Sequence, residues 1–347
     1  MANNLLAINQ GYVDQETLLD VATLRPFKNK QGQSVIHNGQ KEVVVQNALL
    51  RKYEWETIDS AVIDVMRTPI PGVADLISRG LTRALGGLGT FSSVYEQLSD
   101  MSDADVTMNI TAQNAKKDKV AYTSVAVPVP IISKPFEIDI RMLEASRKMG
   151  ESLDTTTTRV ATRKVREALE AMLFNGSTLK VGSSVIYGYT NAPHILNKTA
   201  AAYGGGDFGT DGNAHKTING MIGALNALGF FGPFGMYVSP TQYGQLNALT
   251  GVNLTETQLS VILRTLGNLQ GGLLEFVKPS YSLADGVSII VQLTQDVVDL
   301  AIGQDITAVS WAEFGGLLTQ FRVLTAAVPR IKYDANNACG VAKATAC

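Results

Sequence analysis

A long amphipathic segment constrains the fold of this 347-residue chain more than any other stretch. Residues 154–174 carry apolar side chains at three- and four-residue spacing, which is the period of an α-helix with one buried face. Asp154 is a suitable N-cap, and Gly176 is a suitable stop. The preceding residues 136–142 alternate between apolar and polar side chains, as a half-buried strand does. The sequence therefore predicts a strand that leads into a long helix. The apolar stripe of this helix consists of Val160, Val165, Ala168, Leu169, Met172 and Leu173.

Further elements are predicted on both sides of this helix. Residues 49–66 and 74–88 have helical periodicity and end at Pro69 and at the glycine pair 86–87. Later strands follow one another too closely for helical crossovers and suit an antiparallel sheet, so the predicted class is α+β. The predicted later helices are 215–229, a short one opened by Ser239-Pro240, and one opened by a capping box at 255–258. The predicted later strands are 236–238, 288–293, 296–302, 306–311 and 318–329.

Phe174-Asn175-Gly176 ends the predicted helix, and Gly188-Tyr189-Thr190-Asn191 follows after a short loop. This order resembles tailed-bacteriophage major capsid proteins of the Hong Kong 97 fold, in which a long helix ends in a similar segment and turn. The segment YEWETIDSAVIDVMR around Trp55 resembles the start of encapsulin shells and their phage relatives, and YVSPTQYGQL at 237–246 resembles part of the family's axial domain. The resemblance covers roughly residues 50–335, mostly by element order.

The resemblance implies a division of the chain into four parts. These are an N-terminal arm, a peripheral domain built on the long "spine" helix, an extended β-hairpin loop and an axial domain. The expected ranges are 1–52 for the arm, 53–97, 133–195 and 305–347 for the peripheral domain, 98–132 for the extended loop, and 196–304 for the axial domain.

Two of these parts have more than one interpretation. The arm is acidic up to residue 23 and basic over 24–52, and it is either a solvated tail or a segment laid along a neighbouring subunit. The hairpin is predicted from alternation over 106–110 and 120–129, with its tip at 113–119. Because an isolated hairpin is only marginally stable in water, it either reaches a partner or folds back on its own core.

Composition favours a protein that associates with copies of itself. Charged residues make up 17% of the chain, where about a quarter is usual for soluble domains, so part of the uncharged surface is expected to be covered by neighbours. The net charge of -2 argues against tight nucleic-acid binding, which needs clustered Lys and Arg. The sequence contains no run of 18 apolar residues, so no membrane span is predicted. The N-terminal residues lack the basic region and the cleavage site of a signal peptide.

Enzyme chemistry finds little support, and no catalytic, cofactor-binding or metal-binding residues are predicted. His37, His194 and His215 are too far apart in sequence for local metal spacing. Gly204, Gly206 and Gly209 fit GxGxxG formally, but no convincing strand precedes them, and Asp207 and Asp211 would repel a pyrophosphate. We interpret this stretch as a flexible loop. The sequence also contains an acidic cluster, Asp100, Asp103 and Asp105. It lacks the ligand spacing of a calcium-binding loop, so we interpret it as a solvated turn.

Some capsids of this fold join subunits by a Lys–Asn isopeptide bond. The nearest candidates by position are Lys116, Lys117 or Lys119 with Asn336 or Asn337. Because the reaction also needs a carboxylate in an apolar pocket, which the sequence does not place, we do not expect the cross-link. Cys339 and Cys347 lie in the last nine residues and are expected to be free thiols on a tail.

Together these features predict a structural protein and not an enzyme. Many copies would form hexamers and pentamers that close into an icosahedral phage head around double-stranded DNA, without sequence-specific DNA binding and without cofactors. The expected location is the virion, after assembly in the host cytoplasm, with scaffolding, portal and decoration proteins as further partners. An encapsulin-type nanocompartment is the first alternative, although encapsulins lack the fifty-residue arm that is expected in this chain. An enzyme with an unrecognised site is a remote alternative.

Overall fold

The computed structural model describes most of the chain after residue 70 and short pieces before it. The described residues are 27–28, 34–38, 41–44, 58, 61–62, 70–98, 101, 119–139, 141, 156–182, 184–250, 256–267, 274–313, 318–334 and 336–347. The chain divides into two compact units. The first comprises 1–68, 133–166 and 306–325, and the second comprises 69–132, 167–305 and 326–347. The four-part division inferred from the sequence stays a prediction.

The long helix predicted at 154–174 is confirmed as α5, Thr156–Asn175. The preceding strand is β7, Ile131–Asp139. Together with β4 (Thr82–Ala84), β16 (Val298–Glu313) and β17 (Leu318–Ile331), β7 forms a four-stranded sheet of order β4-β16-β17-β7. The boundary between the two units passes through α5, β7, β16 and β17.

Unit 1 contains a small core and a small sheet. Strands β1 (Phe27–Lys28), β2 (Ser34–Asn38) and β3 (Lys41–Val44) form an antiparallel sheet in that order. Ile58 and Phe321 are fully buried, and Phe136 stacks on Phe321 with ring centroids 5.1 Å apart. The helix predicted at 49–66 lies mostly outside the described residues, of which 58, 61 and 62 are helical.

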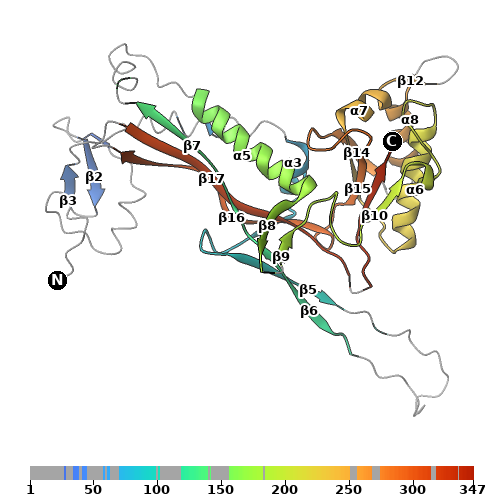
Figure 1. Cartoon of the computed structure of the whole chain (residues 1–347), viewed down its shortest axis with the longest axis horizontal. Coiled ribbons are helices and arrows are strands. Elements are labelled where there is room, and N and C mark those ends of the chain that lie inside the picture. The colour runs from blue at the N-terminus through green and yellow to red at the C-terminus, as the bar shows by residue number, and fades with distance from the viewer. Residues whose placement is uncertain are drawn as a thin grey trace. The chain divides into compact units, whose positions relative to one another are not determined.

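Unit 2 is built on a five-stranded mixed sheet of order β10-β18-β15-β11-β14 (Figure 1). Its central strand β15 is antiparallel to both neighbours, whereas the outer pairs β10–β18 and β11–β14 are parallel. All side chains of β11 are buried, because the sheet is covered on both faces. The strands are β10 (Leu196–Thr199), β11 (Phe234–Val238), β14 (Leu274–Pro279), β15 (Ser288–Gln292) and β18 (Val341–Thr345).

Three helices and a short 3-10 turn accompany this sheet. Helix α6 buries Ile218, Met221, Ile222 and Leu225 in the same core as β11 and β15. Helix α7 begins as predicted, with Ser239 as N-cap and Pro240 in its first turn. These elements are η1 (Ala201–Tyr203), α6 (Asn213–Ala227), α7 (Pro240–Leu246) and α8 (Gln258–Gly267), with the short strands β12 (Leu249–Thr250) and β13 (Glu256–Thr257) between α7 and α8.

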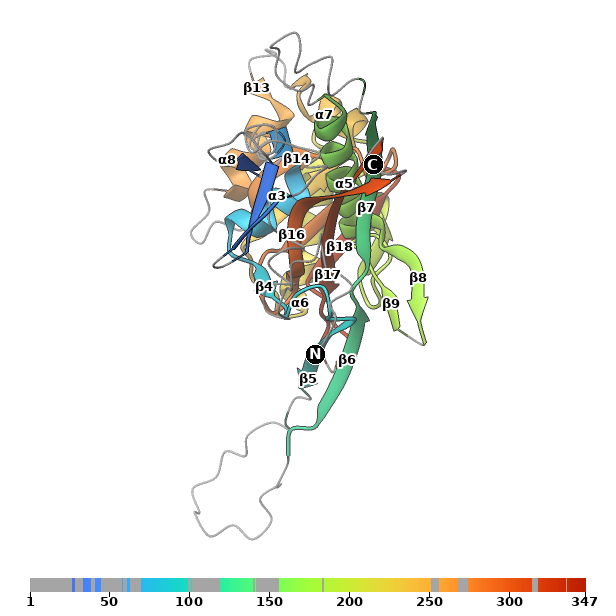
Figure 2. The same cartoon turned by 90° about the vertical axis from the view of Figure 1, so that its left-hand side faces the viewer.

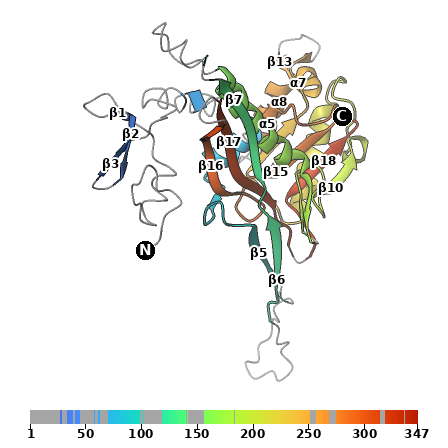
Figure 3. The same ribbon diagram turned by 60° about the vertical axis from the view of Figure 1, so that its left-hand side comes forward.

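Two separate two-stranded ribbons complete unit 2 (Figure 2). The first pairs β5 (Ser92–Leu98) with β6 (Tyr122–Pro128), and β6 continues almost directly into β7 (Figure 3). The second pairs β8 (Ser177–Val181) with β9 (Ser184–Ile186). Neither ribbon joins a larger sheet among the described residues.

Several sequence predictions are wrong in detail. The helix predicted at 74–88 is α3, Pro71–Ser78, and Thr82–Ala84 instead pairs in parallel with Leu300–Ile302. The strands predicted at 296–302 and 306–311 are one continuous strand, β16. The partner of strand 122–128 begins at Ser92, upstream of the hairpin range predicted at 98–132. The predicted tip at 113–119 lies outside the described residues except for Lys119.

Candidate assembly surface

The turn motif after α5 closes the end of that helix. Gly176 has a φ of +71°, and a Cβ on Gly188 would collide with the Gly176 nitrogen, so only glycine fits both positions. The Thr190 hydroxyl and amide both donate to the Phe174 carbonyl, each at 2.9 Å. Asn191 accepts from the Gly188 amide at 2.7 Å and donates to the Asn175 carbonyl at 3.0 Å. The motif is therefore a helix cap supplied from downstream, and it fixes the root of the β8–β9 ribbon.

A carboxylate of α5 caps helix α3. The residue at the N-cap position of α3 is Ile70, which has no capping side chain, and the first turn carries no acid. Glu170 instead accepts from the Gly72 amide at 2.8 Å and from the Val73 amide at 2.9 Å. Its side chain is buried, so this charge stabilises the helix N-terminus in an environment of low dielectric.

Helix α3 is held at a second point by an acid and an aromatic cluster. Asp75 accepts from the Tyr237 hydroxyl at 3.0 Å and pairs with Lys278. The Tyr237 ring packs edge-on against Phe174 and Phe276, with centroids 5.2 Å and 5.6 Å away. Burial raises the pKa of the Tyr189 phenol well above its ordinary value, and the nearby Glu170 carboxylate adds to the shift. These contacts join α3 to the end of α5 and to strands β11 and β14.

The β5–β6 ribbon has one buried face and one exposed face. Tyr95 and Val127 lie in the main core, and Ser93 on the same face is also buried. On the opposite face the side chains of Val94 and Tyr122 are 47% and 68% exposed. Phe91, just before β5, is 84% exposed. Exposed apolar side chains that form a contiguous patch mark surfaces that bind a partner.

The root of this ribbon rests on a buried ion pair. Arg330 is fully buried and donates from Nε to Asp299 at 2.6 Å, with a second bond from its NH2 group to the other carboxylate oxygen. Asp299 also pairs with Lys332 at 2.9 Å. The remaining terminal nitrogen of Arg330 donates to the Ser93 hydroxyl at 3.0 Å, which extends the pair into the ribbon.

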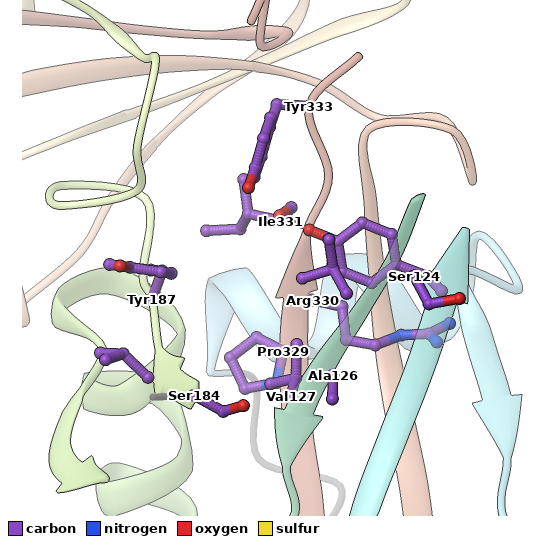
Figure 4. Close-up of a pocket in the computed structure, with 12 residues that line it drawn as sticks. Ser124, Ala126, Val127, Ser184, Tyr187, Pro329, Arg330, Ile331 and Tyr333 are labelled. Carbon is purple, nitrogen blue, oxygen red and sulfur yellow. Dashed lines mark hydrogen bonds between the residues drawn. The ribbon is translucent and has the colours of Figure 1, made fainter. Parts of the chain in front are cut away.

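A pocket of about 380 Å³ lies beside the root (Figure 4). Its walls include β6 with Ser124 and Ala126, the β9 side with Ser184 and Tyr187, and the end of β17 with Pro329 and Ile331. Tyr95 of β5 also lines it. The guanidinium of Arg330 points toward β5 and not into the open space, since its donors are engaged with Asp299 and Ser93. The pocket therefore offers apolar walls and hydroxyl groups but no catalytic charge.

The β8–β9 ribbon also exposes apolar side chains. Leu179 and Val181 in β8 are 58% and 65% exposed. The sequence predicts only a short loop here, because the strands are short and the alternation is confined to Leu179, Val181 and Val185. We define the candidate assembly surface as the exposed side chains of the two ribbons, namely Phe91, Val94, Tyr122, Leu179 and Val181.

The GxGxxG stretch is a packed turn and not a flexible loop. A Cβ on Gly205 would collide with the Thr217 hydroxyl of α6, and Phe208 is fully buried. Asp207 accepts from the Gly209 amide at 2.9 Å and from Gln245 at 3.3 Å. The close packing against α6 therefore involves Gly205, which lies between the motif glycines 204 and 206, and the Asp207 carboxylate turns back onto the loop itself.

His194 and His215 have separate partners in unit 2. His194 lies against the Tyr333 ring, and His215 is hydrogen-bonded to Thr265 at 3.1 Å. His37 lies in β2 of unit 1. The described part of the chain contains no group of three side chains suited to hold a metal ion and no helix long and apolar enough to cross a membrane. Asp100, Asp103 and Asp105 lie outside the described residues.

The two cysteines are free thiols, but they are not on a tail. Both are buried, and between them β18 forms an inner strand of the five-stranded sheet. Burial raises the pKa of Cys339 to about 12 and also raises the pKa of Cys347. The expectation failed because the residues of β18, VAKAT, are short and mixed in polarity, although the sheet buries them.

The isopeptide candidates are only partly described. Lys116 and Lys117 lie outside the described residues, whereas Lys119 lies shortly before β6. Asn336 and Asn337 are exposed in the turn between β17 and β18, where the Asn337 amide donates to the Asp334 carbonyl at 3.1 Å. The expectation that no cross-link forms stays a prediction.

Comparison with solved structures identifies the fold. The virus-like particle protein of Pyrococcus furiosus matches with a TM-score of 0.56 and 18% identity, covering 84% of this chain and 99% of that one. The capsid protein of Myoviridae phage XM1 matches with a TM-score of 0.57 and 13% identity, covering 78% and 91%. The chain therefore has the α+β Hong Kong 97 fold that the motifs predicted.

Sequence comparison gives a relative and a family. The type 1 encapsulin shell protein EncA of Myxococcus xanthus is 25% identical over 295 residues, which are 82% of this chain and 91% of that protein. Residues 30–344 match the profile of a family described as "Family of unknown function (DUF6260)". Since this match spans most of the chain, the protein belongs to the DUF6260 family.

Proposed function

We propose that this protein is the structural subunit of a closed shell, in which copies associate as hexamers and pentamers. Its relatives are named as capsid, virus-like particle and encapsulin shell proteins. The observation that carries the proposal is the candidate assembly surface. Two ribbons, each only two strands wide, expose Phe91, Tyr122 and Val181 by 84%, 68% and 65%. Such ribbons need a covering surface to be stable, and a second copy supplies one.

The proposal does not depend on strong pairwise contacts. In a symmetric shell each contact is repeated, and each subunit is held by several neighbours at once. Burying a large apolar side chain contributes about 1.5–3 kcal/mol. Covering a few of the exposed residues at each contact therefore adds stabilisation that recurs around each subunit.

Among shells, we propose a phage head that encloses double-stranded DNA. The N-terminal arm expected over residues 1–52, acidic up to residue 23 and basic over 24–52, is not expected in encapsulins, and this expectation favours a virus. The low net charge fits a container that does not bind DNA tightly. Scaffolding, portal and decoration proteins are the expected partners, assembly is expected in the host cytoplasm, and the mature protein is expected in the virion.

The encapsulin nanocompartment is the second candidate, because the encapsulin shell protein is 25% identical over 82% of this chain. The contents of purified particles distinguish the two. A phage head holds DNA, whereas a nanocompartment holds a protein cargo carrying a targeting peptide.

The test is electron microscopy and light scattering of the purified chain, with and without candidate scaffolding partners. The proposal predicts closed particles of uniform size. Small monodisperse species under every scaffolding and packaging condition would refute it. Substituting Tyr122→Ser and Val181→Ser is expected to reduce particle yield without loss of secondary structure, whereas Thr123→Ser, an exposed change on the same ribbon, is a matched control.

A further inference from the structure

Asparagine followed by glycine is a pair that is prone to lose ammonia. Because glycine has no Cβ, its amide nitrogen can approach the side-chain amide of the preceding asparagine without a steric barrier. This chain has three such pairs, which begin at Asn38, Asn175 and Asn219. Asn38 ends β2, and its glycine lies outside the described residues. The other two pairs are fully described and lie in unit 2, so their surroundings can be compared.

The reaction is a deamidation through a five-membered ring. The glycine nitrogen loses its proton to a base and attacks the asparagine Cγ. The Cγ–Nδ2 bond then breaks, and Nδ2 takes up a proton and leaves as ammonia. Water opens the resulting cyclic imide at either carbonyl, which yields an aspartyl or an isoaspartyl residue. At Asn175 the reaction therefore consumes the amide proton of Gly176 and removes the Nδ2 group of Asn175.

Both of these groups are engaged in hydrogen bonds at the end of α5. Asn175 is the last residue of α5, and the Gly176 amide donates to the Met172 carbonyl at 2.9 Å. Nδ2 of Asn175 donates to the Ser282 carbonyl at 2.7 Å. Oδ1 of Asn175 accepts from the Thr190 hydroxyl at 3.2 Å. We call these three hydrogen bonds the amide lock, and ring closure at Asn175 requires them to break.

The amide lock depends on tertiary contacts. Ser282 and Thr190 lie 107 and 15 positions away from Asn175 in the sequence. The third bond belongs to the last turn of α5, and helix ends fray when nothing holds them. Since Asn175 is itself exposed, water and base reach it as soon as the turn formed by residues 188–191 moves away. Loss of the tertiary contacts therefore exposes the reactive pair without unfolding the rest of the chain.

The pair in α6 provides a contrast within the same unit. Asn219 and Gly220 lie in the interior of α6, where each amide donates to the carbonyl four residues back. A Cβ on Gly220 would lie 2.0 Å from the Tyr203 carbonyl, so this turn of the helix is closely packed. The Asn219 pair is therefore protected by the helix itself, and it reacts only when α6 unfolds.

Deamidation at Asn175 destroys the contacts that prevent it. An aspartyl carboxylate has no N–H to donate, and it is repelled by the Ser282 carbonyl that Nδ2 contacts. It also places a negative charge at the negative end of the α5 dipole. An isoaspartyl residue lengthens the main chain by one carbon atom, which displaces the Asn175 carbonyl from Asn191 and the Gly176 amide from Met172.

We propose that Asn175-Gly176 is a deamidation site, which the turn after α5 keeps unreactive and which reacts when Thr190 and Ser282 release it. The loss of ammonia is irreversible in solution, so the product keeps the turn open and the helix cap acts as a one-way switch. All the contacts of the amide lock lie in unit 2, so the proposal does not depend on assembly into a shell.

The test follows both pairs in the purified chain by peptide mass spectrometry at mildly alkaline pH. The mass of each peptide reports the replacement of an amide by a carboxyl, and labelling with isoaspartyl methyltransferase reports the isoaspartyl product. In urea, Asn175 and Asn219 are expected to convert at similar rates. Because three hydrogen bonds must break, the native rate at Asn175 is expected to be lower than the urea rate by a factor on the order of 100.

Thr190→Ala removes one bond of the amide lock and is expected to accelerate conversion of Asn175 in the native chain about fivefold. Thr190→Ser keeps the hydroxyl and is the matched control, with the wild-type rate. Conversion of Asn219 is expected to stay slow in both variants, and its acceleration identifies a variant that has unfolded. In that case the comparison of native and urea rates in the wild-type chain decides.

Two results would overturn the deamidation site. One is equal conversion of Asn175 in the native wild-type chain and in urea. The other is equal conversion of Asn175 in folded Thr190→Ala and Thr190→Ser.

The one-way behaviour is tested with two variants of the asparagine itself. Asn175→Asp carries the charge of the product, whereas Asn175→Ser has neither the charge nor the amide. The Tyr189 and Thr190 amides donate to the carbonyls of Leu173 and Phe174, so their hydrogen exchange reports whether the turn is closed. Exchange is expected to be faster in Asn175→Asp than in Asn175→Ser. Exchange that is equal or slower in Asn175→Asp refutes the switch.

Discussion

Glu170 is predicted to be the largest single polar contribution to the attachment of α3. Replacing it with Ala removes two charge-assisted hydrogen bonds, to the amides of Gly72 and Val73, and leaves both donors without an acceptor in a buried site. A hydrogen bond to a charged group contributes about 1.5–3 kcal/mol, so the loss in the free energy of unfolding is expected to be about 3 kcal/mol or more for Ala. In Glu170→Gln one side-chain oxygen can still accept a hydrogen bond, so the expected loss in the free energy of unfolding is about half of that for Ala.

The assay is urea unfolding of the unassembled chain followed by circular dichroism, together with amide hydrogen exchange. Exchange of the Gly72 and Val73 amides is expected to accelerate in both variants. Glu167→Gln is the matched control, because Glu167 is exposed on the same helix and its loss should cost less than about 1 kcal/mol. If the free energy of unfolding of Glu170→Ala lies within about 0.5 kcal/mol of the wild-type value, the capping role inferred from the distances is wrong.

Further predictions concern the helix-ending turn, the aromatic cluster and the thiols. Gly188→Ala is expected to prevent folding, because the new Cβ collides with the Gly176 nitrogen. Thr190→Ala removes one hydrogen bond and is expected to lower the free energy of unfolding by about 1 kcal/mol. Equal expression and stability of the two variants would contradict this difference. Tyr189→Phe is expected to be neutral or stabilising in thermal unfolding, because the buried hydroxyl has no hydrogen-bond partner in the structure; a loss above about 1 kcal/mol would show that the hydroxyl is satisfied. Cys339 and Cys347 are expected to resist alkylation at pH 8 until urea unfolds the chain, and fast labelling of the native protein would place them at the surface. In the folded chain the pKa values of both thiols lie above their usual 9.0, so the unfolded chain loses these protons first as the pH rises. The contribution of the thiols to the free energy of unfolding is therefore expected to be constant below about pH 9 and to fall above it. A cysteine-to-serine double variant whose stability falls equally over that range would show that other groups cause the loss.

Local patterns predicted the elements that depend on local interactions. The period of residues 154–174 matched α5 closely, and Ser239-Pro240 matched the start of α7, since the Ser239 hydroxyl accepts from the Gln242 amide. The Gly-Tyr-Thr-Asn motif pointed to the fold, and the structure gives its physical reason, which is the closing of the helix end.

The features that failed depend on distant partners. Thr82–Ala84 is a strand only because Leu300–Ile302 lies beside it, and its own sequence continues the helical period of α3. The hydrogen bond from Arg330 to Ser93 joins residues more than two hundred positions apart, so no spacing in the sequence marks either residue. An arginine late in a strand reads as a surface residue until the fold buries it beside Asp299.

The candidate assembly surface was predicted only in outline. Alternation over 120–129 indicated one strand of the hairpin, but which face is exposed follows from the burial of Tyr95 and Val127. The β8–β9 ribbon gave little signal, because its strands are five and three residues long.

Shell assembly is tested most directly by a cryo-electron microscopy reconstruction of particles formed by the purified chain. We expect a closed shell with five-fold vertices, in which a neighbouring copy covers Phe91 and Tyr122 of each β5–β6 ribbon. Particles whose ribbons remain uncovered in solvent, or a chain that stays monomeric with its scaffolding partners present, would contradict it.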